Sequence, residues 1–370
     1  MNYFDYNATT PIDKEVAEAM LPFIYSDFGN PSSNSDYGRI TKAAIEKARQ
    51  QVASILNCQS SEITFTSGGS ESNNMVIKGV AYSYRHKGKH IITSVIEHPA
   101  VLNPLKYLEE NGYEITYIPV DEYGMINPKS VEEAIRDNTI LITIMHSNNE
   151  VGTLQPIKEI ARIANAKKVL FHTDAAQSIG KVMVDVKDLN VDFLTIAGHK
   201  LYAPKGIGAI YIREGINIEP LIHGANQEQG KRAGTENVIF DVALGKACEI
   251  AQAKLKNEST LNLTNHLLIE LKKEFGERIK LNGHPTVRLP NTLNISFIGF
   301  NGHEIVERLG KIVVSAGSAC HSGQTSISPV LQAMNIPNEI SRGAVRISIG
   351  RDTTLEEINL LVQKLVILFN

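Results

Sequence analysis

The sequence predicts an α/β protein: a large domain with a mainly parallel seven-stranded sheet, followed by a smaller α/β C-terminal domain. Two observations carry this prediction. Between about residues 60 and 215, short apolar runs rich in β-branched residues alternate with helix-like segments, a pattern typical of βα units in a parallel sheet. After a polar, glycine-containing loop at 223–235 and a long helical stretch at about 237–275, a second series of strand-like and helix-like segments begins.

Seven runs are expected to form the strands of the large sheet: EITF (62–65), HIITSVI (90–96), EITYIPV (114–120), ILITIM (140–145), KVLFHT (168–173), DFLTIA (192–197) and GAIYIR (208–213). Helical patterns such as KSVEEAIR (129–136) and IKEIARIANAKK (157–168) lie between them. The smaller unit is expected to contain NTLNISFIGF (291–300), a helix near 303–309, IVVSAGSAC (312–320) and AVRISIG (344–350).

The domain boundary is expected near residue 257, within the polar stretch KNES. Residues 15–257 then form the large domain, and residues 258–370 form the small domain. Residues 1–14 are expected to pack with the small domain.

The composition excludes several classes of function. The formal net charge is −3 without long runs of like charge, which does not favour direct binding of nucleic acid. The N-terminal MNYFDYNATTPID has no apolar signal region, and the stretch LVILF is far shorter than the roughly 20 residues of a membrane span. We therefore expect a cytoplasmic protein without a membrane partner. Cys58, Cys248 and Cys320 are widely spaced and form no CxxC motif, so neither disulfides nor a metal site are expected.

Polar residues follow the predicted strands at their carboxyl ends, where open parallel sheets bind ligands. After EITF, Gly69 and Ser70 open a helix and would offer N–H groups and a hydroxyl to a phosphate. Helix capping is the alternative role of this turn. The next strand is followed by His98, which suits stacking on a ring or moving protons, with a structural histidine as the alternative.

Three further strands end in residues that suit cofactor chemistry. Asn149 follows ILITIM in a polar cluster that would orient a ligand or cap a turn. Asp174 ends KVLFHT, with Gln177 one helical turn later; a carboxylate there would hold a protonated pyridine nitrogen or cap a helix. Lys200 follows DFLTIA, where a desolvated amine suits Schiff-base formation, although a lone lysine is more often a surface charge. The ordered set favours an enzyme that binds pyridoxal 5'-phosphate (PLP) through Lys200 and acts on an amino acid.

At these residues the sequence resembles the NifS/IscS-like cysteine desulfurases, in the class V aminotransferase group of fold type I PLP enzymes. The matching segments span nearly the whole chain: DYNATTP (5–11), FGNPSS (28–33), FTSGGSESNN (65–74), EHPAVL (97–102), MHSNNEVGTLQPI (145–157), FHTDAAQSIGK (171–181), AGHKLYAPKGIGAIY (197–211), HGANQEQGKRAGTENV (223–238) and SAGSACHSG (315–323). Motifs of this length in this order are highly specific.

The resemblance implies a fold type I PLP-dependent transferase that forms a homodimer with active sites at the subunit interface. It implies a set of cofactor-binding residues: Lys200 as the Schiff-base lysine, His98 stacked on the ring, Asp174 on the pyridine nitrogen, Gln177 on the ring hydroxyl, Gly69, Ser70 and His199 at the phosphate, and Thr235 reaching it from the other subunit. Asn149 would contact both cofactor and substrate. Arg346 would bind the substrate carboxylate through its guanidinium fork.

The implied reaction converts L-cysteine to L-alanine. Lys200 removes the Cα proton, the ring stores the charge, and the thiolate of Cys320 attacks the substrate sulfur. The resulting persulfide passes to a protein acceptor that supplies iron–sulfur clusters, thio-cofactors or tRNA thiolation. Independently of the resemblance, Cys320 lies in a Gly/Ser-rich loop that suits a mobile nucleophile. A small buried residue, the alternative role of a cysteine, fits Cys248 better.

The sequence departs from the family pattern at Ala197, at Ser70, where threonine is commoner, and in the loop after His223, and three alternative functions remain open. Ala197 stands where many relatives carry a serine, which removes one hydroxyl from the phosphate site. The segments ACHS (319–322) and SPVL (328–331) are reminiscent of selenocysteine lyases, which use the same cofactor. An aminotransferase or β-lyase of the same fold would need no nucleophilic cysteine. A non-catalytic partner subunit that keeps the fold is the alternative outside enzymes.

Overall fold

The large sheet of the protein has seven strands. The structure is a computed structural model that describes residues 2–255, 257–316, 320–321, 324–325 and 327–369, with only the backbone described at 320–321 and 324–325. In spatial order the strands are β2 (Ile63–Thr66), β8 (Gly208–Ile212), β7 (Phe193–Ala197), β6 (Leu170–Asp174), β5 (Thr139–Thr143), β3 (His90–Ser94) and β4 (Glu114–Ile118). Strand β8 pairs antiparallel with both neighbours, and the remaining pairs are parallel. The prediction of a mainly parallel seven-stranded sheet is confirmed.

Neighbouring residues of one strand belong to different hydrophobic clusters, because successive strand side chains point to opposite faces. Ile91 packs in the cluster of α3 and α4, whereas Ile92 packs in the cluster of α2, α6 and α8. Both faces of the sheet are therefore covered, and the strands read as nearly continuous apolar runs.

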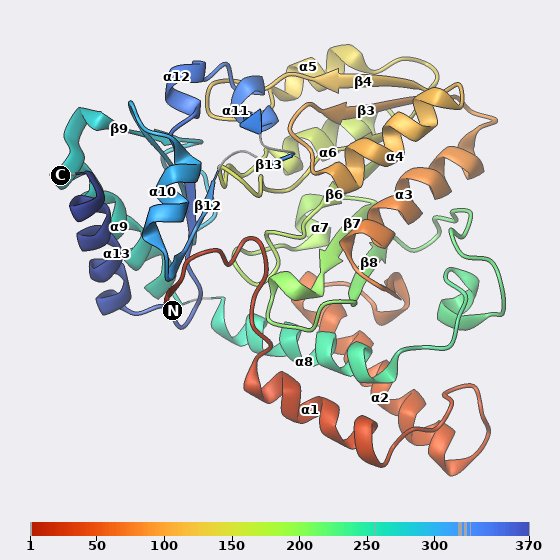
Figure 1. The fold of residues 1–370 in the computed structure, drawn as a ribbon. Coiled ribbons are helices and arrows are strands. Elements are labelled where there is room, and N and C mark those ends of the chain that lie inside the picture. The colour runs from red at the N-terminus through yellow and green to blue at the C-terminus, as the bar shows by residue number, and fades with distance from the viewer. Residues whose placement is uncertain (1, 256, 317–319, 322–323, 326, 370) are drawn as a thin grey trace.

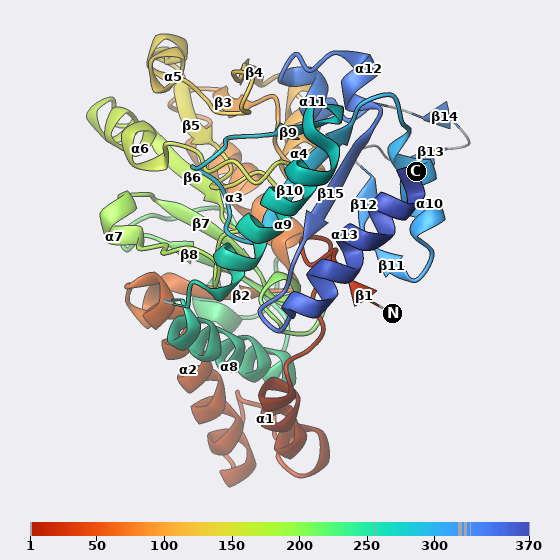
Figure 2. The same cartoon turned by 90° about the vertical axis from the view of Figure 1, so that its left-hand side faces the viewer.

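Helices surround this sheet (Figures 1 and 2). Their bounds are α1 (Lys14–Tyr25), α2 (Asp36–Leu56), α3 (Gly69–Tyr84), α4 (Pro99–Glu110), α5 (Pro128–Ala134), α6 (Ile157–Ala166), α7 (Val186–Leu189) and α8 (Val238–Lys254), with 3₁₀ turns η1 (Ser60–Glu62), η2 (Gly198–Lys200) and η3 (Gln227–Gly230). None of the helices in the described ranges has the length and apolar character needed to cross a membrane.

The second unit is an antiparallel sheet with helices beside it, on the left in Figure 1. Its strands are ordered β12 (Ser315–Ala316), β15 (Ala344–Ser348), β10 (Thr292–Phe297) and β9 (Ile279–Asn282). Its helical elements are α9 (Ser259–Phe275), η4 (Gly276–Arg278), α10 (Gly302–Leu309) and α13 (Leu355–Phe369). Two short helices between β12 and β15, α11 (Pro329–Ala333) and α12 (Asn338–Ser341), instead pack through Leu331 and Ile340 in the hydrophobic cluster of the large unit. The backbones of β13 (Cys320–His321) and β14 (Gln324–Thr325) pair as a separate hairpin.

We propose the domain boundary at residue 257. This position lies between α8 and α9, whose buried residues belong to different hydrophobic clusters. In the N-terminal segment, β1 (Asn2–Tyr3) pairs with β11 (Ile312–Val313), and Phe4 is buried among residues of the small unit. Residues after Phe4 reach the large sheet, so this segment joins the two units at the site described next.

Candidate active site

A cavity of about 420 Å³ lies at the carboxyl ends of the central parallel strands. Nine residues that the sequence singled out line this cavity: Gly69, Ser70, His98, Asn149, Asp174, Gln177, His199, Lys200 and Arg346. They come from the ends of β2, β3, β5, β6 and β7, or from the turns and helix starts that follow these strands, and from β15. The structure thus brings together the residues expected at successive strand ends.

Lys200 lies in the 3₁₀ turn η2, immediately after β7. Its Nζ donates hydrogen bonds to the main-chain oxygens of Asn7 at 2.5 Å and Ala8 at 2.8 Å. Burial, with a further contribution from Arg346, lowers the pKa of Lys200 to about 8. The amine is therefore deprotonated much more readily than an exposed lysine, as a nucleophilic or basic lysine requires.

Asp174 ends strand β6 and is buried, yet its carboxylate faces the cavity. One oxygen accepts a hydrogen bond from Asn73 Nδ2 at 2.7 Å, and the other accepts from the Ala176 N–H at 2.9 Å. Gln177 lies beside it and donates through Nε2 to the Asn7 oxygen at 2.9 Å. Such a fixed, buried carboxylate suits a cationic group within the cavity, such as a protonated ring nitrogen.

The start of α3 is built for an anion. Gly68 precedes the helix with φ 149°, a conformation that favours glycine, and no described side chain caps this helix end. The first-turn N–H groups and Ser70 border the cavity beside the N-terminal end of the helix dipole. A Cβ added at Gly69 would lie 3.3 Å from the Cβ of Ala197. The methyl group of Ala197 thus fills the position from which a serine hydroxyl would reach this end of the cavity.

Two histidines complete the rim. His98 caps α4, because its Nδ1 accepts a hydrogen bond from the Ala100 N–H at 3.1 Å, and it also lines the cavity. Burial lowers the pKa of His98 and lowers that of His199 to about 4, with Lys200 adding to the latter effect. The His199 imidazole is therefore neutral at pH 7, and the site favours the neutral form of His98.

Arg346 reaches the cavity from strand β15 of the small unit. Its Nη2 lies 2.6 Å from Asp5 Oδ1, and its Nη1 donates to the Asn149 oxygen at 3.1 Å. Its buried Nε has no hydrogen-bond partner in the described part of the chain. Because Asp5 already pairs with Arg346, an incoming carboxylate has to share or displace this contact.

Two predicted site residues are not placed in the cavity. Thr235 is exposed in the loop before α8 and does not line the cavity of its own chain. The backbone of Cys320 forms β13, while its side chain lies outside the described residues. For the other two cysteines, burial raises the pKa of Cys58 and of Cys248 to about 12, so both remain protonated thiols.

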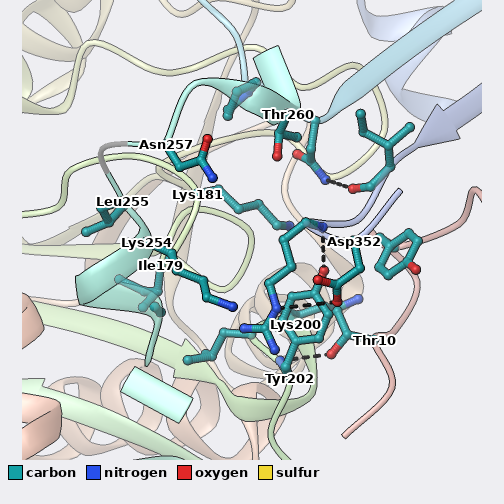
Figure 3. Close-up of a pocket in the computed structure, with 18 of the residues that line it drawn as sticks. Thr10, Ile179, Lys181, Lys200, Tyr202, Lys254, Leu255, Asn257, Thr260 and Asp352 are labelled. Carbon is teal, nitrogen blue, oxygen red and sulfur yellow. Dashed lines mark hydrogen bonds and ion pairs between the residues drawn. The ribbon is translucent and has the colours of Figure 1, made fainter. Parts of the chain in front are cut away.

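Sequence reasoning missed three residues of this region. Asn7 is buried and joins both units, and Asp5 pairs with Arg346. Lys181 lines a second cavity of about 300 Å³ that Lys200 also borders (Figure 3). The motifs DYNATTP (5–11) and FHTDAAQSIGK (171–181) contain all three, but no local pattern separates these side chains from capping or surface residues.

Comparisons with known proteins agree with this geometry. Residues 2–361 match the family model described as Aminotransferase class-V. The chain is 50% identical to "Cysteine desulfurase IscS" of Methanosarcina thermophila, covering 98% of this chain and 90% of the relative. A solved structure titled "NIFS-LIKE PROTEIN" has a TM-score of 0.93 at 38% identity, covering 100% of this chain and 99% of the other. The structure "SspA in complex with cysteine" has a TM-score of 0.85 at 40% identity, covering 94% and 99%.

The chain therefore belongs to the class-V aminotransferase family. Within that family, the resemblance to NifS/IscS-like cysteine desulfurases that the motifs indicated is confirmed, as is the fold that it implied.

Proposed function

We propose that this protein is a PLP-dependent cysteine desulfurase, which converts L-cysteine to L-alanine and transfers the sulfur to a protein acceptor. The observation that carries the proposal is Lys200, an amine with a pKa lowered to about 8, in one cavity with a buried carboxylate, an uncapped helix start and an arginine. Its relatives that are named cysteine desulfurases, and the neighbouring structure titled as a complex with cysteine, support the substrate.

The donor set of the cavity fits PLP. Asp174 would hold the ring nitrogen, Gln177 the ring oxygen, and the start of α3 with Ser70 the phosphate. His98 would lie against the ring, and His199 would act as a neutral phosphate ligand. When bound, PLP supplies an electron sink for negative charge at the substrate Cα.

The substrate is oriented by groups at the other side of the cavity. Arg346 would bind the carboxylate of cysteine by a charge-assisted fork, beside Asn149. Lys200, as a neutral amine, accepts the Cα proton and later returns a proton to the product. The low-dielectric surroundings that lower its pKa also hold it in the basic form.

Sulfur leaves through Cys320 in this proposal. The Cys320 thiolate attacks the substrate sulfur, the bond between that sulfur and Cβ breaks, and Cys320 carries the persulfide while Cβ is protonated to give alanine. We further propose a homodimer in which the exposed Thr235 contacts the phosphate bound by the partner subunit. The sulfur acceptor is a protein whose identity this chain does not specify.

Intact mass spectrometry after incubation with L-cysteine tests the reaction. PLP-loaded protein is expected to gain sulfur atoms on Cys320, and Cys320→Ala is expected to gain none. Cys58→Ala is the matched control and should gain sulfur like the wild type, because its protonated thiol has no part in the reaction. Full production of alanine with sulfur transfer by Cys320→Ala would refute the persulfide step.

Two measurements distinguish the alternative reactions. Product analysis separates a desulfurase from a β-lyase, which forms pyruvate and ammonia. A large kcat/KM preference for selenocysteine would favour a selenocysteine lyase.

A further inference from the structure

Lys181 is a lysine without an acidic partner beside the proposed cofactor site. It lies four residues after Gln177, in the turns that follow β6, and no carboxylate forms an ion pair with it within the described ranges of the chain. Its Nζ donates to Gln177 Oε1 at 2.8 Å and to Asn7 Oδ1 at 3.3 Å. Figure 3 shows Lys181 and Lys200 together in the lining of the second cavity.

Burial and, to a smaller extent, repulsion by neighbouring cations make this an unfavourable position for a charged amine. Burial lowers the pKa of Lys181 well below its ordinary value, and Lys200 and Arg346 lower it further. An apolar side chain of the same length would avoid the desolvation of this amine. Folding stability alone therefore does not favour a lysine here.

The orientation of the Gln177 amide is set from two sides, by the main-chain oxygen of Asn7 and by the amine of Lys181. The Asn7 oxygen can only accept, so Gln177 must turn its NH₂ group towards it. The Lys181 amine donates to Oε1 at the opposite side of the same amide. Within the described part of the chain, Gln177 Nε2 makes no hydrogen bond other than that to Asn7, so its second N–H is available to a ligand in the site cavity that the Gln177 side chain lines.

We propose that Lys181 is a positioning residue, which holds the Gln177 amide so that its N–H, and not its oxygen, faces the ring oxygen of the cofactor. This role rests on the PLP site proposed above. The reversed amide would direct lone pairs of Oε1 at an anionic ring oxygen, which is repulsive.

The test is a pH titration of the visible absorbance band of PLP-loaded protein without cysteine. A hydrogen-bond donor to the ring oxygen stabilises the anionic form of that oxygen. It would therefore lower the pKa of the proton shared by the ring oxygen and the Lys200 nitrogen. Lys181→Met is therefore expected to raise the titration midpoint by about one pH unit, the equivalent of one lost hydrogen bond. Lys181→Arg keeps a donor and should restore the wild-type midpoint. Lys254→Met is the matched control, because exposed Lys254 also lines the second cavity but does not contact Gln177.

A double-mutant cycle separates positioning from simple charge removal. Gln177→Met alone should raise the midpoint by a similar amount, and Lys181→Met should add nothing in that background. A shift from Lys181→Met that persists without Gln177 would overturn the proposal, as would a changed melting temperature with an unchanged midpoint. Lys181→Gln provides a second amine-free variant if the methionine variant does not fold. If the wild-type protein shows no visible band, both the proposed cofactor site and this role of Lys181 are overturned. If the band is normal but its titration midpoint is the same in Lys181→Met, only the role of Lys181 is overturned.

Discussion

Replacing Glu228 by glutamine should reduce the free energy of unfolding by about 3–5 kcal/mol, because it removes the buried counter-charge of Arg49 and leaves the arginine with Glu46, a half-exposed partner at 3.3 Å. Glu228 receives two hydrogen bonds from Arg49, at 2.6 Å and 2.8 Å, and one from the Phe65 N–H at 2.9 Å. The side chains of this pair are only 5% and 4% exposed. Although burial opposes the charge of Arg49, its hydrogen bonds with Glu228 more than offset this effect and raise the pKa of Arg49.

The backbone at this position adds to the expected cost. Glu228 and Gln229 have φ of 47° and 59°, which lie in the left-handed region of backbone conformation. Residues other than glycine rarely adopt this region. Two such residues in succession cost about 1–3 kcal/mol each and persist only where other contacts hold them. The pair with Arg49 is therefore expected to hold the loop at 223–235, which carries Thr235.

An exposed arginine–glutamate pair with the same N–O distance provides the control. Arg136 Nη1 lies 2.6 Å from Glu114 Oε2, the same distance as in the buried pair, but these side chains are 52% and 58% exposed. Glu114→Gln should cost only about 0–1 kcal/mol. Urea unfolding, monitored by circular dichroism, gives the free energy of unfolding of both variants. The comparison requires that the m-value is the same in each. Equal losses for Glu228→Gln and Glu114→Gln would refute the argument that burial decides the energy of the pair.

Two further predictions concern the amine and the packing of helices. Cofactor uptake by the apoprotein should accelerate about tenfold per pH unit below pH 8 and level off above it, because the neutral form of Lys200, whose pKa is lowered to about 8, reacts. Asp5→Asn removes a carboxylate that raises this pKa, so the plateau should begin at lower pH; stopped-flow absorbance measures both, and a flat profile would contradict the assignment. Gly245→Ala should destabilise the protein by about 1–3 kcal/mol, because the new Cβ would lie 2.5 Å from Ala48 Cα where α8 crosses α2. An unchanged or higher melting temperature would contradict that close packing.

The strands of the large sheet were predictable because most are buried apolar runs between polar turns; β4, at the edge of the sheet, is exposed or half-buried except at Ile118. Their spatial order was not, since no local pattern shows that β8 enters between β2 and β7 in the opposite direction. The helical stretch at 237–275 reads as almost continuous, yet α8 and α9 are separate helices. Asn257 accepts a hydrogen bond from the Ser259 N–H at 2.9 Å, a local side-chain contact that competes with helix continuation.

The candidate site was predictable where each residue follows its own strand. Asp174 and Lys200 meet because parallel strands bring their carboxyl ends to one edge of the sheet. The contact between Asp5 and Arg346 joins residues 341 positions apart, so it depends on how the N-terminal segment packs. Periodicity and motif spacing contain no information on a pairing of this kind.

The N-terminal segment explains how one site can serve two states of Lys200. Before attachment to a cofactor, the amine is held by the main-chain oxygens of Asn7 and Ala8. In the proposed function, attachment of PLP would engage this amine elsewhere, and the Asn7 oxygen would still accept a hydrogen bond from Gln177. Because Lys181 donates to Oε1 of the same amide, we expect the amide to keep its orientation when Lys200 moves. The buried Asn7, which also contacts Thr292 of the small unit at 2.8 Å, thus links the position of the reactive amine to the packing of both units.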